Sequence, residues 1–252
     1  MYILITAALV FARVSGLIIS MPFFNSRLIP DMIKVLFALL LTGLLTSVLP
    51  PLYTEIGIGL LLVSMTAEFI FGILIGGTVS LVFASLSVMS NIVSAQVGLA
   101  AAIQFNPTMS IPLSPLGNMS VLLATAVFMS SGLHLQLFLL LGESFSVIPI
   151  NQVADPLSGV MMWVGYCNQM FIVGLQMASP VLILTLLINS FIAILAKVAP
   201  SMNMFFSVGF IATMAVGLWL FMYLLPNILT AEQRVLQDVI HNLPKLFELV
   251  GP

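Results

Sequence analysis

The sequence predicts an all-α, polytopic integral membrane protein built of long kinked helical hairpins. Of its 252 residues, 61% are hydrophobic and only 6% are charged, and the mean hydropathy is +1.25. A soluble domain of this size needs far more charge to cover its surface. In addition, the whole stretch between Glu68 and Glu143 contains no Asp, Glu, Lys or Arg. Most of this chain is therefore expected to lie in lipid or against other helices.

Three segments of the first half have the length and apolarity of spanning helices, which need roughly 20 residues each. The first covers 3–24 and is expected to be a retained span rather than a cleaved leader, because it lacks a positive amino-terminal region. The second covers 31–49 and ends at two consecutive prolines, and the third begins near residue 56. A group of prolines between residues 106 and 117 must interrupt the helix that follows.

The second half repeats this alternation of apolar segments and polar connectors. We expect a fourth span over 118–141, a wetter connector to residue 156, and a long helix over 160–196 that bends at Pro180. A last span over 202–225 should end at Pro226. Thr230 and Gln233 have capping-box spacing, and an amphipathic tail helix follows them. That tail could rest on a membrane surface or on a partner.

Polar side chains without charge are frequent between residues 85 and 120, where many serines alternate with small residues. Hydroxyls and amides lose hydrogen bonds in hydrocarbon, at a cost of about 1–3 kcal/mol each. They should face protein or a water-filled cavity. Gln169 and Gln176 are seven residues apart on the later helix and share one face.

The proline-broken segment 104–113 is the sharpest local feature. Irregular backbone at membrane depth is tolerated only when it is buried in protein or lines a cavity. One reading is a flexible apolar plug in a channel, and the other is an ordinary connector. The residues concerned are Phe105, Asn106, Pro107, Met109, Ile111, Pro112 and Leu113.

Isolated ionisable residues allow two readings each. Arg13 could serve a pathway or a partner, or reach toward the membrane interface. Glu68 could couple protons or pair with a basic residue on a neighbouring helix. His134 has no partner at metal-ligand spacing and is expected to be a packing residue.

Catalysis, cofactor binding and metal binding are not expected. The sequence has one cysteine, and it contains no nucleotide loop, no hydrolase elbow and no zinc-binding helix motif. The net charge of −2 gives no surface for nucleic acid.

Four segments of the chain together resemble a known family. They are ARVSGLIISMPFFNSRLIPDMIKV with Arg13, Pro22, Arg27, Pro30 and Lys34; AQVGLAAAIQFNP with Gln96 and Gly98; GLHLQLFLLLGESFSVIPI; and LAKVAPSMNMFFSVGF with Lys197 and Pro200. In their order and nearly full coverage they resemble the FliR family of flagellar biosynthetic proteins (FliR/SctT). The match departs from the family pattern at Ser201 and at 211–214, which weakens the resemblance in the last hairpin.

The resemblance implies a core subunit of the bacterial type III protein export gate, which forms and seals the entrance pore for flagellar proteins. Family members assemble helically with FliP and FliQ, and FlhB wraps the assembly. It further implies a FliP-like part over 1–155 with its plug loop at 99–115, and a FliQ-like hairpin with an amphipathic tail over 156–252. The expected location is the inner membrane at the flagellar basal body, with part of the assembly on the periplasmic side. Unfolded export substrates and membrane lipid are further expected partners.

Two other functions remain open on sequence grounds. One is the equivalent subunit of a virulence injectisome. The other is a small-molecule secondary transporter, which would need internal repeats and intramembrane charges at a midplane site. No convincing repeat is visible, and Glu68 is a thin basis for coupling.

Overall fold

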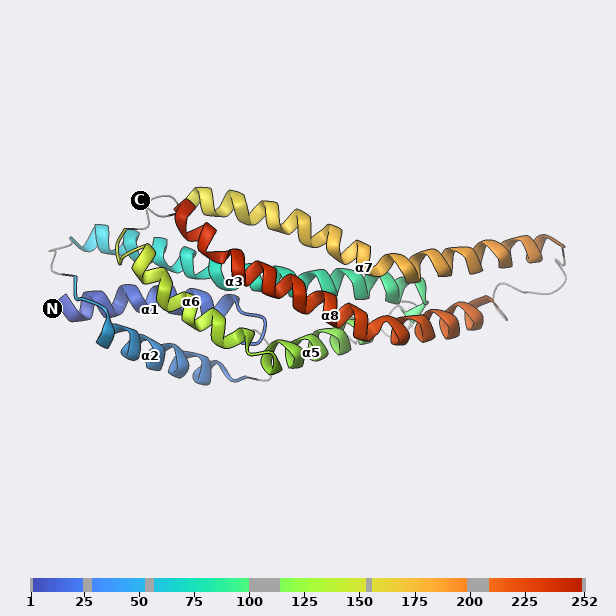
Figure 1. Cartoon of the computed structure of the whole chain (residues 1–252), viewed down its shortest axis with the longest axis horizontal. Coiled ribbons are helices and arrows are strands. Elements are labelled where there is room, and N and C mark those ends of the chain that lie inside the picture. The colour runs from blue at the N-terminus through green and yellow to red at the C-terminus, as the bar shows by residue number, and fades with distance from the viewer. Residues whose placement is uncertain are drawn as a thin grey trace. The chain divides into compact units, whose positions relative to one another are not determined.

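The computed structural model describes residues 2–24, 29–52, 57–99, 114–152, 156–198 and 209–250. Within these ranges the chain is helical and contains no strand. The helices, drawn in Figure 1, are α1 (Tyr2–Ser20), α2 (Asp31–Val48), α3 (Ile58–Gln96), α5 (Pro115–Ser130), α6 (Leu133–Val147), α7 (Pro156–Val198) and α8 (Phe210–Val250).

The predicted fourth span is not one continuous helix, because the structure divides it into α5 and α6, which have the length and apolarity of a span only as a bent pair. The two helices are bent by 66° at a short break. Gly132 lies in this break with a φ of 72°, a left-handed conformation that costs glycine little and other residues more. The sequence stays apolar on both sides of the break, so Gly132 is the local feature that could have indicated it.

The predicted end at Pro226 is also wrong, because α8 continues without interruption to Val250. Thr230 lies inside the helix, where its hydroxyl donates to the backbone oxygen of Asn227 over 2.9 Å, so it is no cap. A proline removes one backbone hydrogen bond from a helix. Here Phe221 and Ile228 are buried on either side of it, and this packing keeps both turns helical.

The chain forms two compact units that are each assembled from separate stretches. Unit 1 contains Met1–Val82, Phe128–Asn168 and Val235–Pro252, and unit 2 contains Phe83–Val127 and Gln169–Arg234. The long helices α3, α7 and α8 contribute residues to both.

Unit 1 is held together by very close packing of α1 against α3. A β-carbon added at Gly72 would overlap the backbone oxygen of Arg13, and one at Gly16 would overlap the backbone oxygen of Phe69. Gly76 is similarly crowded by Leu17 and Ser20. Small residues therefore let the two backbones touch, which is the usual device for helix association in membranes.

The amphipathic tail packs inside unit 1. Its stripe is confirmed, but it covers the protein's own core and not a membrane surface. The ring of Phe247 meets that of Phe71 on α3 with centroids 5.6 Å apart. The other buried members of the stripe are Leu236, Val239, Ile240, Leu243 and Leu246.

Unit 2 packs the second part of α3 against α7 and α8. Gly174 on α7 lies against the backbone oxygen of Ser85, and Gly217 on α8 lies against Val97. Several serines and threonines are buried here and donate to carbonyls of their own helix, as Ser90 does to Leu86 over 2.7 Å. Most of the described serines between residues 85 and 120 therefore face protein, as predicted, whereas Asn91 stays exposed.

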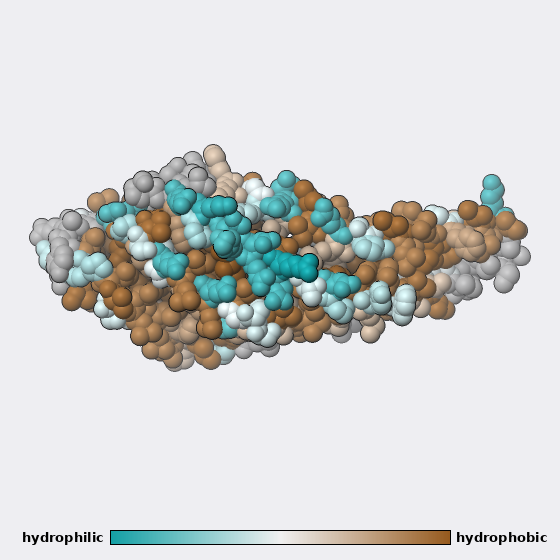
Figure 2. Space-filling view, viewed as in Figure 1, coloured by the Kyte–Doolittle hydropathy of each residue, from teal (hydrophilic) through white to brown (hydrophobic). Residues whose placement is uncertain are grey.

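Five of the described helices are long and apolar enough to cross a membrane, and the bent pair α5–α6 would make a sixth. Figure 2 shows hydrophilic side chains gathered over the C-terminal half of α8, whereas those over α2 are hydrophobic. Only 11% of the apolar window of α2 is buried. A membrane-associated location follows from these surfaces.

The contact between α1 and α3 is tested by Gly72→Ala, with Gly43→Ala on α2 as the matched control. Gly72→Ala should destabilise the fold by about 1–3 kcal/mol, because its β-carbon must displace the backbone of Arg13. Gly43 has nothing within 4 Å, so its alanine should be neutral or slightly stabilising. The midpoint temperature of thermal unfolding is measured for each purified variant in detergent. An equal fall of this temperature in both variants would contradict the close packing.

Candidate functional site

The carboxyl end of α3 carries two of the residues singled out in the sequence, Gln96 and Gly98. The helix closes with a bond from the Val97 amide to the Val93 oxygen (2.9 Å), followed by one from the Gly98 amide to the Ala95 oxygen (3.2 Å). Gly98 has a φ of 86°, and a β-carbon there would overlap the ring of Phe210. Glycine is therefore required for both backbone conformation and space.

The chain returns to described structure at a well-formed helix start. Ser114 is buried, and its hydroxyl oxygen accepts a bond from the backbone N–H of Gly117 over 3.1 Å. Pro115 occupies the first helical position, where its missing N–H has no cost. The described residues on either side of 100–113 are thus held within unit 2.

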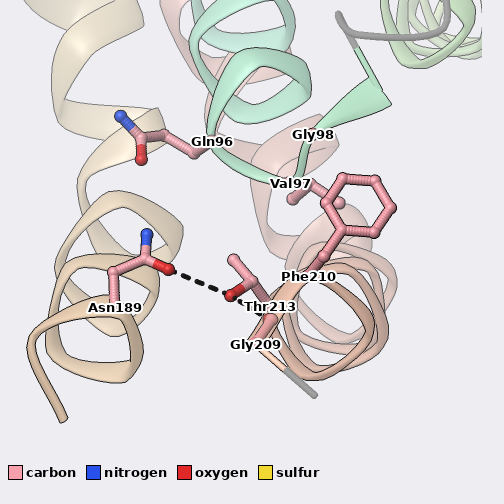
Figure 3. A pocket seen from close by; sticks show the side chains of 7 residues that line it. All are labelled: Gln96, Val97, Gly98, Asn189, Gly209, Phe210 and Thr213. Carbon is pink, nitrogen blue, oxygen red and sulfur yellow. Dashed lines mark hydrogen bonds between the residues drawn. The ribbon is translucent and has the colours of Figure 1, made fainter. Parts of the chain in front are cut away.

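A pocket of about 180 Å³ opens beside Gly98 in the same unit. Figure 3 shows the amides of Gln96 and Asn189 on one side of it and the ring of Phe210 beside Gly98. The hydroxyl of Thr213 lies 3.1 Å from Asn189 Oδ1 and 2.8 Å from the backbone oxygen of Gly209. A hydroxyl has one proton, so it can donate to only one of these oxygens at a time.

The pocket is chemically neutral. Its amides can donate to and accept from a peptide backbone, but it contains no acid, base or metal ligand. Among the described residues there is also no group of three His, Cys, Asp or Glu side chains that could hold a metal ion. Such a pocket can hold a segment of chain but has no group for catalysis.

A second polar centre lies inside unit 1, around Arg13. This side chain is fully buried, and its Nε donates to Glu68 Oε2 over 2.6 Å. Its other nitrogens donate to the Ser144 hydroxyl and to the backbone oxygen of Ile148, both over 3.1 Å. The guanidinium also stacks on the ring of Phe145, 4.1 Å from its centroid.

The carboxylate of Glu68 is satisfied on both oxygens. Its Oε1 accepts from the backbone N–H of Asn151 over 3.0 Å, and the Asn151 side chain in turn accepts from Ser64. Asn151 has a φ of 68°, a left-handed conformation that asparagine tolerates better than most residues. Arg13 and Glu68 therefore pair with each other, and the interface-reaching reading of Arg13 is wrong.

The remaining singled-out residues lie apart from both centres. Pro22 is half-buried in the bend after α1, and Pro30 directly precedes α2. Lys34 bonds Asp31 over 2.8 Å, and Lys197 is exposed in the last turn of α7. Arg27, Pro200 and the expected plug residues Phe105, Asn106, Pro107, Met109, Ile111, Pro112 and Leu113 lie outside the described residues.

Sequence reasoning missed the partners in both centres. Asn189 is a polar residue in an apolar helix, and the bond between its Oδ1 and the Thr213 hydroxyl bridges α7 and α8. Ser144 lies 131 residues from Arg13 along the chain. The only sequence signal was a hydroxyl in an apolar segment, and that pattern does not identify its partner.

The buried pair is tested by Arg13→Ala, Glu68→Ala and the double variant. Each single change should cost about 3–5 kcal/mol of stability, because it leaves one charge buried without compensation. The double variant should cost clearly less than the two together. The free energy of unfolding is measured in mixed micelles for the two single variants and the double variant. Asp31→Ala, which breaks the exposed pair with Lys34, is the control and should cost less than about 1 kcal/mol. Strictly additive single effects would contradict the coupling.

Comparison with known proteins shows which family this chain resembles. The family model described as "Bacterial export proteins, family 1" matches residues 4–239. A flagellar biosynthetic protein FliR from Pectobacterium carotovorum subsp. carotovorum is 31% identical over 235 residues, covering 91% of this chain and 87% of that protein. FliR of Escherichia coli (strain K12) is 27% identical and covers 92% and 91%, and FliR of Aquifex aeolicus (strain VF5) is 26% identical and covers 93% and 91%.

The family match includes both α1 with its buried arginine and the carboxyl end of α3 with its neutral pocket. It also agrees with the helical, membrane-associated fold and with the lack of catalytic groups in the described pocket. The chain belongs to family 1 of the bacterial export proteins, together with the flagellar biosynthetic proteins FliR.

Proposed function

We propose that this chain is a non-enzymatic core subunit of the flagellar type III protein export gate, and that it helps form the export pore and keeps it closed at rest. Family membership supports the first part of this function. The observation that carries the second part is the apolar, proline-rich segment 100–113 with both of its ends fixed in unit 2.

The composition of the segment suits a seal. It contains no charged residue, and its bulky apolar residues Phe105, Met109, Ile111 and Leu113 flank Pro107 and Pro112, which exclude a regular helix. Methionine and bulky apolar side chains adapt to an irregular opening. Because Gly98 and Ser114 on either side of it are held in unit 2, such a segment can block a pore and remain tethered beside it.

Exposed amides support a multi-subunit assembly. Asn91, Asn118, Gln169 and Gln176 are exposed on otherwise apolar helices. Each would cost about 1–3 kcal/mol in hydrocarbon without a hydrogen-bond partner. We assign these surfaces to contacts with FliP and FliQ subunits, with FlhB around the assembly. In this proposal residues 1–155 are the FliP-like part and 156–252 the FliQ-like part.

The proposed location is the bacterial inner membrane at the flagellar basal body, with part of the assembly on the periplasmic side. The exposed amides support this too, because helices that carry them are better suited to protein contacts outside the bilayer than to lipid.

Deletion of residues 106–112 tests the seal. The deleted chain should still assemble with its co-expressed partners, because the fixed ends at Gly98 and Ser114 remain. The membrane should then leak small ions, measured as conductance or as loss of membrane potential in expressing cells. A second variant replaces Phe105, Met109, Ile111 and Leu113 by serine and so keeps the length of the segment. Membranes with this variant should also leak, because the apolar side chains make the seal. A deleted chain that assembles normally and stays tight would refute the plug.

Gly98→Ala tests the fixed end, with Gly132→Ala as the control. Both glycines have positive φ, so each alanine should cost about 1–2 kcal/mol in backbone strain. Only the alanine at residue 98 also meets the ring of Phe210, whereas Gly132 has nothing within 4 Å. Gly98→Ala should therefore raise the leak measured in the same conductance assay, and Gly132→Ala should not. An equal leak from both variants would show that strain alone is responsible.

A further inference from the structure

An apolar groove of about 400 Å³ lies in unit 1 where the α1–α2 connector meets α6. Aromatic rings form much of its wall: Phe24 stacks on Phe37 with centroids 5.3 Å apart, and Phe37 meets Phe138 at 5.7 Å. Its volume falls within the range of about 300–1,000 Å³ that is usual for small-molecule sites. The function proposed above does not use it.

The groove lies at one end of two candidate membrane spans. α1 ends at Ser20 and α2 begins at Asp31, and the lining residues between them belong to the connector. When these helices cross a bilayer, their shared end lies near the headgroups. α2 is the least buried of the candidate spans, and Ile33 on the groove wall is about half exposed.

Two groups add polarity to this apolar site. Among the described lining residues, His134 alone has a polar side chain, and its Nδ1 is buried without a hydrogen-bond partner. Lys34 follows Ile33 directly and lies one turn before Phe37 on α2. Its side chain is only 21% exposed, so its stem is packed while its ammonium bonds Asp31, which is itself 94% exposed. An exposed pair of this kind is worth at most about 1 kcal/mol and is easily exchanged.

We propose that this groove binds one phospholipid, with an acyl chain along the rings and the headgroup phosphate on Lys34. The ring-lined wall excludes water and suits a flexible hydrocarbon chain. The ammonium of Lys34 exchanges Asp31 for the headgroup phosphate, because an anionic lipid surface attracts each nearby lysine with about 1 kcal/mol. The ammonium of Lys34 follows the ring-lined wall along α2, and this pairing of an apolar groove with a cation matches an acyl chain joined to an anionic headgroup.

Photo-crosslinking in vesicles tests the site. The full chain is reconstituted into phosphatidylcholine vesicles that contain a phosphatidylglycerol with a photoreactive acyl chain. Labelled peptides are then mapped by mass spectrometry. Labelling should concentrate on the peptides that carry Phe24, Phe37 and Phe138. Labelling spread evenly over the exposed faces of α2 and α7 would overturn the proposal.

Lys34→Ala separates a specific headgroup site from general contact with lipid. It should lower phosphatidylglycerol labelling of the groove about fivefold, the usual weight of one lysine at an anionic surface. Lys245→Ala is the control, because that lysine bonds Asn242 on α8 and is exposed away from the groove. Equal labelling in both variants would refute the role of Lys34. The experiment is repeated with the co-expressed complex, where the groove should keep its lipid label. Loss of the label from the groove in the complex would show that a partner protein fills it and would overturn the proposal.

Discussion

The ion pair between Arg13 and Glu68 is the constraint on which unit 1 depends. In an apolar interior an unpaired charge is so costly that the two side chains must find each other when the helices associate. Their hydrogen bonds then reach Ser144, Ile148 and Asn151, so one centre fixes α1, α3, α6 and the turn after α6. The glycine contacts between α1 and α3 bring the backbones close enough for this, but apolar contacts alone would allow the helices to slide. The charges define a single register.

Much of the helical pattern could be predicted, because spans in this sequence are bounded by prolines and charged residues. The start of α2 at Asp31 and its end before Pro50 are confirmed. The errors arose where local signals and packing disagreed. Gly132 breaks an uninterrupted apolar stretch through its left-handed backbone, whereas Pro226 fails to end α8 because buried neighbours hold both sides. Hydropathy cannot distinguish these cases, since both lie in apolar surroundings.

The candidate site was only half predictable for a related reason. Gln96 and Gly98 were singled out because they belong to the segment AQVGLAAAIQFNP that resembles the family. Asn189 and Thr213 complete the pocket from other helices, and no spacing rule connects them to α3. The same holds for the ionic centre: two charges were visible, but the hydroxyl and the turn carbonyl that satisfy Arg13 are set by the tertiary fold.

The tail of α8 has a consequence for the order in which this protein can mature. Its apolar stripe covers a face of α3, and the ring of Phe247 closes over Phe71 almost at the end of the chain. During synthesis that face of α3 must therefore stay uncovered until the ribosome has made α8. The nascent chain is most exposed to mispairing or degradation during this interval, so completion of α8 closes the core of unit 1.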